Sequence, residues 1–240
     1  MIVIERSKKF STSPKLFLKQ EEMREIKFLV LHHVQADSVE HAIAQFLQHE
    51  VSSHFLIDVD GKIFELVDEN DVAYHAGVSF WAGVDGLNKC SIGIEFINPA
   101  PFEKKFSAAQ MQAGLELCQY LIAKHNIAAK NIVGHSDIAY DKQTGLLDRK
   151  QDPSNLFDWK FLAQNGVGIF PQNVKKGEKV SLKKTKEMLK NFGYKVENLT
   201  DDLDEEMKGL AIVFNRRFLN LNSNIWSDES QAALNELSNF

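Results

Sequence analysis

The segment "KFLVLHHV" (residues 27–34) has apolar residues on both faces of any strand that it forms. Such a strand is stable only inside a sheet that is covered on both sides. The next segment, "SVEHAIAQFLQHE" (38–50), places Val39, Ile43 and Phe46 at helical spacing after a Ser38 cap. A doubly covered strand followed by an amphipathic helix indicates an α/β fold.

The sequence up to about Pro171 continues this mixture of strands and helices. Asp60-Gly61 suits a tight turn between two strands, which predicts a hairpin over residues 53–69. Other patterns predict a strand over 89–98, a long helix over 107–127 and a last strand at "NIVGH" (131–135). We therefore expect one α/β domain over residues 1–171, with an N-terminal extension at 1–25.

The pattern changes from residue 172 onward. "QNVKKGEKVS" is polar and basic, and we interpret residues 172–180 as a linker. Beyond it only helical periodicity remains, with one stripe at Leu182, Met188, Leu189 and Phe192, a second at Met207, Leu210, Ala211, Phe214 and Phe218, and a short third segment over 227–237. This predicts a small three-helix domain over residues 181–240.

Charge and hydropathy exclude two classes of partner. The formal net charge is -5, whereas a general nucleic-acid binder needs a basic surface. No stretch approaches the roughly 18 continuous apolar residues of a membrane span. The start "MIVIERSKKF" shows no secretory signal, which taken alone favours the cytoplasm. The sequence does not determine an oligomeric state.

Histidines follow two of the predicted strands. His32 ends the first apolar strand and His135 ends the last. Two imidazoles and a loop carboxylate would make the three-ligand set of a catalytic zinc, with a fourth position open. Histidines satisfied within a core are the simpler reading of the same pattern.

Glu95 is a second unusual residue, because it lies in a strand whose alternate positions are apolar. A carboxylate in a buried strand costs free energy unless something binds it, and Gly93 would leave room for a ligand beside it. The alternative is a glutamate on a solvated face of the sheet.

Several motifs occur in an order that resembles type 2 N-acetylmuramoyl-L-alanine amidases. They are "FLVLHH", "SSHFLIDVDGKIFELVDE", "VAYHAG", "LNKCSIGIEFIN", "VGHSDIA" and "RKQDP", and the resemblance covers roughly residues 26–170. It implies a central mixed sheet flanked by helices and a Zn²⁺-dependent peptidoglycan amidase. Residues 178–240 more loosely resemble the three-helix peptidoglycan-binding domains that follow many wall hydrolases.

The resemblance also implies roles for individual residues. His32, His135 and Asp152 would bind zinc, whereas His33 falls at a non-ligand position. Glu95 matches the catalytic glutamate and Lys150 the catalytic lysine. Five further residues match positions around the cleft, as substrate contacts or as support for the ligands: His54, Tyr74, His75, Trp81 and Asn88.

The implied reaction is hydrolysis of the amide bond between N-acetylmuramic acid, or its 1,6-anhydro form, and L-alanine of the stem peptide. Peptidoglycan or muropeptides would be the substrate, and the periplasm or cell envelope the expected location. The alternatives are a cytoplasmic recycling amidase specific for anhydro-muropeptides and a non-catalytic peptidoglycan recognition module. The segment "YDKQTGLLD" (140–148) departs from the family pattern and is expected to lie beside the metal, where it would narrow or remodel the cleft.

Overall fold

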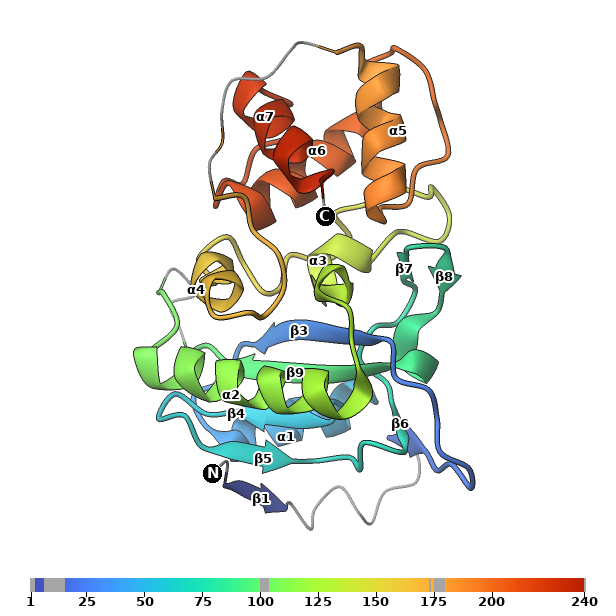
Figure 1. Cartoon of the computed structure of the whole chain (residues 1–240). Helices are drawn as coiled ribbons and strands as arrows, with labels where there is room; N and C mark the ends of the chain where they lie inside the picture. Colours follow the sequence, from blue (N-terminus) through green and yellow to red (C-terminus); the bar gives the residue numbers. More distant parts are fainter. Residues whose placement is uncertain (1–2, 7–15, 100–103, 173, 175–179, 240) are drawn as a thin grey trace.

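The computed structural model describes residues 3–6, 16–99, 104–172, 174 and 180–239. Its main element is one six-stranded sheet in the order β1-β5-β4-β9-β3-β10 (Figure 1). The β4–β5 pair is antiparallel and the other neighbours are parallel, so the predicted mixed sheet is confirmed. The strands are β1 (Ile4–Arg6), β3 (Phe28–Val34), β4 (Phe55–Ile57), β5 (Ile63–Glu65), β9 (Ser91–Ile97) and β10 (Ile132–Gly134).

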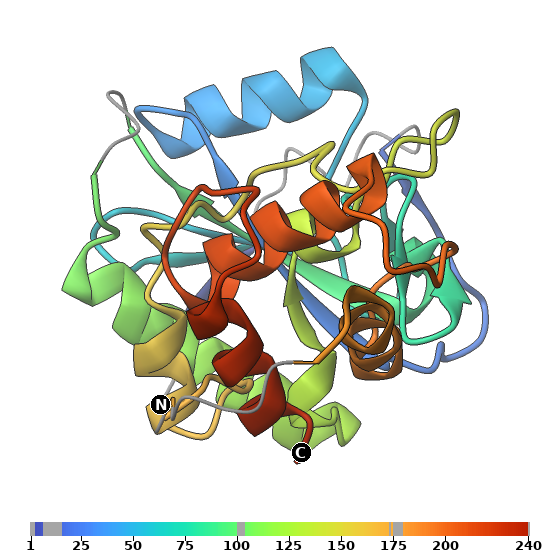
Figure 2. The ribbon, with the colours of Figure 1, turned by 90° about the horizontal axis from the view of Figure 1, so that it is seen from above.

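Two helices cover opposite faces of the sheet (Figures 1 and 2). Helix α1 (Val39–His49) is capped by the Ser38 side chain and packs with β4 in one apolar cluster. Helix α2 (Ala108–His125) begins at a capping box on Ser107 and packs against β9 in the other cluster. The doubly covered strand that the sequence predicts is β3, an interior strand between β9 and the edge strand β10.

Shorter elements connect these layers. Two small two-stranded sheets pair β2 (Phe17–Leu18) with β6 (Val72–Ala73) and β7 (Phe80–Trp81) with β8 (Val84–Asp85). The short helical segments are η1 (Leu87–Cys90), η2 (Ala129–Asn131), α3 (His135–Ile138) and α4 (Trp159–Gln164). None of the helices within the described ranges is long and apolar enough to cross a membrane.

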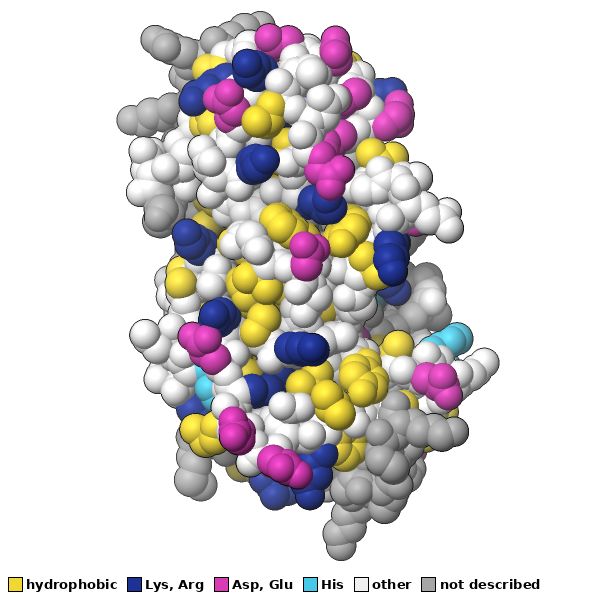
Figure 3. Space-filling model, turned by 90° about the vertical axis from the view of Figure 1, so that its right-hand side faces the viewer, with side chains coloured by type: hydrophobic (Ala, Val, Ile, Leu, Met, Phe, Trp, Pro, Cys, Tyr) yellow, Lys and Arg dark blue, Asp and Glu magenta, His cyan; other side chains and the backbone are white. Residues whose placement is uncertain are grey.

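Three helices follow at the C-terminal end, namely α5 (Leu182–Phe192), α6 (Glu205–Phe218) and α7 (Asp228–Leu237). Their apolar side chains belong to the same buried cluster as those of β9 and α2. In the space-filling view they continue the surface of the sheet-containing part without a break (Figure 3). The domain boundary at residues 171–181 stays a prediction, and most of the predicted linker (172–180) lies outside the described residues.

Candidate metal centre

Three segments bring the predicted metal ligands to one edge of the sheet. His32 lies near the carboxyl end of β3, and His135 begins α3 immediately after β10. β10 runs parallel to β3 with Gly134 opposite Leu31, so the two histidines emerge side by side. Asp152 comes from the loop that precedes α4 and completes the group.

The distances and burial suit a cation with three protein ligands. Asp152 Oδ2 lies 3.1 Å from His32 Nδ1 and 3.1 Å from His135 Nδ1, and the three ligand atoms all lie within 4.8 Å of one another. Both imidazoles are buried. Two imidazole nitrogens and one carboxylate oxygen are the donors that a catalytic zinc uses.

The protonation states also favour a cation. Burial, together with the neighbouring His135, lowers the pKa of His32 to about 4, so its ring is neutral and offers a lone pair. Burial alone would raise the pKa of Asp152. The charge of His135 and the hydrogen bonds with both histidines outweigh burial and hold that pKa well below its usual range. A neutral His32 and an ionised Asp152 are the protonation states in which these two residues bind a metal.

The outer nitrogen of His32 is held by a chain of polar groups. His32 Nε2 lies 3.1 Å from His75 Nδ1, and His75 Nε2 lies 3.2 Å from Ser91 Oγ. The Ser91 hydroxyl donates to the Leu87 carbonyl at 2.7 Å. Because the Ser91 hydroxyl donates to Leu87, its oxygen accepts from His75 Nε2, and His75 Nδ1 then accepts from His32 Nε2. His32 Nδ1 is left free for a metal, which is how such partners orient metal-bound histidines.

His135 is oriented in the same way by the main chain. Its Nε2 lies 3.2 Å from the Ala76 carbonyl oxygen. The Asn88 side chain accepts hydrogen bonds from the amides of His75, at 3.1 Å, and Ala76, at 2.8 Å. Asn88 therefore fixes the turn at His75 and Ala76, which supports both His32 and His135. Asn88 and His75 thus lie behind the predicted ligands.

Gly93 lets the His75 ring pack directly against its strand, so it leaves no space there for a ligand. A Cβ atom at Gly93 would lie 2.5 Å from the His75 ring. The expectation of an open space beside Glu95 was therefore wrong, because the imidazole of His75 fills it.

We expect Gly93→Ala to weaken zinc binding by about 10- to 100-fold, since the displaced His75 ring can no longer hold His32. Competition with a chromogenic chelator measures this change. Gly114→Ala is the control, because a Cβ there would meet the Phe96 ring at 2.6 Å, a comparable clash that does not involve His75. Unchanged zinc affinity in Gly93→Ala would contradict a role for His75 in holding the ligand.

Glu95 pairs in register with His32 across the β3–β9 ladder. Its Oε2 is buried without a hydrogen-bond partner among the described residues, so the solvated-face alternative does not hold. Burial, reinforced by the negative charge of Asp152, raises the pKa of Glu95 well above its usual value, while Lys150 opposes the rise. A carboxyl with one enclosed oxygen and a raised pKa, beside a candidate metal site, is a typical setting of a proton-transfer group.

Lys150 has an exposed side chain, two residues before Asp152 in sequence. Its positive charge contributes to lowering the pKa of both His32 and Glu95, which indicates that its ammonium group is close to the cluster. The predicted catalytic and metal-binding residues therefore lie within one region of the structure.

His33 belongs to a groove beside the cluster and is not a member of the cluster. Its Nδ1 accepts a hydrogen bond from the Ser154 amide at 3.5 Å. The groove has a volume of about 440 Å³ and is lined in part by Asp152, by Gln35 after β3, and by Asn222 from the C-terminal part. A substrate bound here would reach the metal ligands directly.

The remaining predicted cleft residues differ in their accessibility. Tyr74 is half-buried, and its main chain pairs with that of Ser52. His54 is buried, accepts from the Gly93 amide at 3.0 Å and lies 3.1 Å from the Asp71 carbonyl, so it supports the strand.

Trp81 departs from the expectation of a cleft residue. It is fully buried against Phe192 and Tyr194, where its indole donates to the Lys130 carbonyl at 3.2 Å. A substrate contact is therefore excluded for Trp81 in this conformation, because the C-terminal aromatic residues cover it.

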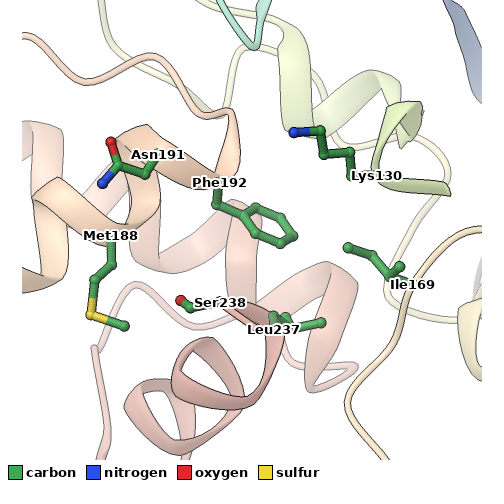
Figure 4. A pocket seen from close by; sticks show the side chains of 7 residues that line it. All are labelled: Lys130, Ile169, Met188, Asn191, Phe192, Leu237 and Ser238. Carbon is green, nitrogen blue, oxygen red and sulfur yellow. The ribbon is translucent and has the colours of Figure 1, made fainter. Parts of the chain in front are cut away.

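A smaller pocket of about 190 Å³ lies between the C-terminal helices and the rest of the molecule (Figure 4). Phe192, Leu237 and Ile169 give it a largely apolar lining, with Lys130 on the side away from α5. None of the predicted site residues lines it. We interpret it as a packing gap between elements and not as the reaction site.

Comparisons with known proteins agree with this geometry. The family model described as N-acetylmuramoyl-L-alanine amidase matches residues 22–155. The chain is 40% identical over 164 residues to N-acetylmuramoyl-L-alanine amidase AmiD of Escherichia coli, covering 61% of this chain and 55% of that protein. It is 37% identical over 118 residues to 1,6-anhydro-N-acetylmuramyl-L-alanine amidase AmpD of Haemophilus influenzae, covering 49% and 59%. The chain thus spans somewhat more than half the length of these curated relatives.

Solved structures extend the likeness to the C-terminal helices. The complex of E. coli AmiD with anhydro-N-acetylmuramic acid-L-Ala-D-gamma-Glu-L-Lys superposes with a TM-score of 0.75 at 32% identity, covering 91% of each chain. AmpDh3 from Pseudomonas aeruginosa gives a TM-score of 0.77 at 28% identity, covering 92% of this chain and 94% of that one.

Proposed function

This chain belongs to the N-acetylmuramoyl-L-alanine amidase family, and we propose that it hydrolyses the amide bond between N-acetylmuramic acid, or its 1,6-anhydro form, and L-alanine of the stem peptide. The observation that carries the proposal is the cluster of the buried His32 and His135 with the half-buried Asp152, beside the buried, unpartnered Oε2 of Glu95. A recognition module without activity would need neither an open ligand set nor a proton-transfer group next to it.

His32, His135 and Asp152 would hold zinc through two nitrogens and one oxygen. When bound there, zinc supplies Lewis acidity, which acidifies water and polarises a carbonyl oxygen. The support of His32 by His75 and of His135 by the Ala76 carbonyl keeps the two Nδ1 atoms directed inward. Asp152 stays ionised because of its histidine neighbours.

Glu95 is the proposed proton carrier. Its carboxylate accepts a proton from the water that attacks the lactyl carbonyl carbon. It then returns this proton to the nitrogen of L-alanine as the C–N bond breaks. The products are the sugar with its lactyl carboxylate and a stem peptide with a free amine, so one water is consumed per bond. The raised pKa of Glu95 suits a group that must both accept and donate.

Lys150 would face the negative charge that develops on the carbonyl oxygen during attack. We expect Lys150→Ala to lower kcat by about 100-fold or more while retaining zinc, because the charge is stabilised mainly in the transition state. Lys142→Ala is the matched control, since Lys142 is exposed on the preceding loop. Steady-state kinetics on a purified muropeptide measure the effect, and a Lys150→Ala enzyme with normal kcat would remove Lys150 from the mechanism.

The proposed reaction has two candidate substrate classes, soluble anhydro-muropeptides and intact peptidoglycan. Among the relatives, AmiD and AmpDh3 are described in complexes with anhydromuramic peptides, so the anhydro form is a supported candidate. Mass spectrometry of products from purified anhydro-muropeptides and from intact sacculi compares the two directly. We expect a free stem peptide beginning with L-alanine, and cleavage within the peptide or the glycan would contradict the amidase proposal.

We propose that the protein acts in the periplasm or cell envelope, with the cytoplasm as the alternative. Hydrolysis of intact sacculi at a rate comparable to that of soluble fragments would support the envelope. A strict requirement for soluble anhydro-muropeptides would support the recycling alternative.

A further inference from the structure

Helix α6 contains two adjacent arginines whose side chains leave the C-terminal helices and enter the sheet-containing part. Arg216 is 2% exposed and Arg217 is 1% exposed. A buried guanidinium is costly unless its N–H groups find acceptors. The acceptors that these two residues reach therefore show what α6 is built to hold.

Arg217 holds the segment that carries His135. Its Nη1 donates to Asp137 Oδ2 at 2.6 Å and its Nη2 to the Ile132 carbonyl at 2.7 Å. Asp137 lies two residues after His135 in α3, and its other oxygen accepts from the Tyr194 hydroxyl at 3.1 Å. The helices α3 and α6 are in direct contact, and both views show α6 crossing over α3 (Figures 1 and 2).

Arg216 holds the segment that carries Lys150 and Asp152. Its Nη2 donates to Asp148 Oδ1 at 2.7 Å, and its Nη1 lies 3.4 Å from the Lys150 carbonyl oxygen. The Nε atom donates to Asn222 Oδ1 at 3.0 Å, and Asn222 lines the groove next to Asp152. One guanidinium thus connects α6, the groove wall and the main chain of Lys150.

The segment 140–148 is the counterpart of α6 in this contact. Leu147 is buried and packs against Gly209, where a Cβ atom would lie 3.6 Å from the Leu147 Cβ. Asp148 ends the segment with its ion pair to Arg216. None of the residues 140–148 lines the groove beside Asp152, so the expectation that this segment narrows the cleft finds no support there. The segment instead packs against α6 through Leu147 and Asp148.

We propose that Arg216 is a positioning residue for the reaction, which fixes residues 148–152 so that the Lys150 ammonium and the Asp152 carboxylate face the same substrate. This inference rests on the proposed amidase function. The planar guanidinium reaches three acceptors from three separate nitrogens in a fixed arrangement, which the single nitrogen of a lysine ammonium does not match. Helix α6 then supports the candidate catalytic centre through Arg216, in addition to packing with the other C-terminal helices.

Arg216→Lys tests this proposal in the full-length protein. It keeps the charge but loses the fork, and we expect kcat on anhydro-muropeptide to fall about 10-fold or more with little change in KM. Zinc affinity, measured by chelator competition, is expected to weaken several-fold, because Asp152 loses its fixed position. Asp148→Asn is a milder variant that removes the negative charge but keeps an oxygen acceptor, and we expect smaller changes in the same direction.

Thr185→Val is the control for loss of stability alone. Thr185 is buried and donates to Gln231 Oε1 at 2.6 Å, which joins α5 to α7 away from the metal cluster. We expect it to lower the melting temperature while leaving kcat and zinc affinity unchanged. If Arg216→Lys and Thr185→Val lower the melting temperature and spare catalysis alike, Arg216 is merely structural and the proposal is overturned.

A double-mutant cycle with Lys150→Ala separates positioning from a general loss of activity. Once the Lys150 side chain is absent, Arg216→Lys should cost much less in kcat than it does in the wild-type background. Fully additive effects would contradict the proposal. If the wild-type enzyme cleaves no muropeptide, the proposed function fails, whereas the zinc competition of Arg216→Lys still tests the positioning of Asp152.

Discussion

Replacing Glu95 with glutamine is expected to lower kcat by about 100- to 10,000-fold while leaving the bound zinc and the fold intact. The amide has nearly the shape of the carboxyl, but it can neither take a proton from water nor give one to the leaving amine. Because Glu95 Oε2 has no hydrogen-bond partner among the described residues, the substitution breaks no bond of that oxygen. Kinetics on purified muropeptide, with zinc content and melting temperature measured on the same sample, check this expectation.

Glu116→Gln is the matched control for Glu95→Gln, since Glu116 is exposed on α2 and lies in no part of the site. It should leave all three measurements unchanged. A Glu95→Gln enzyme that retains a near wild-type rate would show that another group transfers the proton, and the proposed mechanism would then be wrong.

Alanine substitutions of the adjacent residues His32 and His33 are expected to differ strongly in zinc content. We expect the wild-type protein to bind about one zinc per chain, and His32→Ala to lose this zinc together with all measurable activity. His33→Ala should retain the metal, because His33 lies outside the three-residue cluster and contacts the Ser154 amide instead. Elemental analysis of protein purified without added chelator measures the zinc content directly.

Equal zinc in the two histidine variants would contradict the assignment of His32. Full zinc with lost activity in His32→Ala would instead show that the ligand set is different and that His32 acts on the substrate. His135→Ala and Asp152→Ala should behave as His32→Ala does, since the three ligand atoms form one cluster.

The sequence predicts much of the fold because local patterns determine it. The doubly apolar strand, the Asp60-Gly61 hairpin, the helix capped by Ser38 and the long helix predicted over 107–127 appear as β3, β4–β5, α1 and α2. These features depend on side-chain alternation, turn residues and caps within a few positions of one another. The proximity of His32 and His135 is not visible in that way. It depends on a parallel pairing between strands a hundred residues apart, and the family resemblance supplied it.

Contacts across the molecule explain what the sequence did not reveal. Trp81 matches a cleft position of the family, but aromatic residues from the C-terminal part of the chain bury it. The role of Gly93 likewise depends on where the His75 ring lies in the folded chain. Arg216 and Arg217 read locally as the basic last turn of a helix. Only tertiary structure shows that they are buried and joined to the segments that carry the predicted metal ligands.

The shared apolar core has a thermodynamic consequence for the C-terminal helices. Because α5, α6 and α7 bury their side chains with those of the sheet, we expect them to unfold together with the metal ligands. A ligand that binds only the folded state stabilises everything that unfolds with its site, by about 2.7 kcal/mol at a free concentration 100 times its Kd. Zinc would therefore protect helices that it never touches, and a chelator would loosen them together with the cleft.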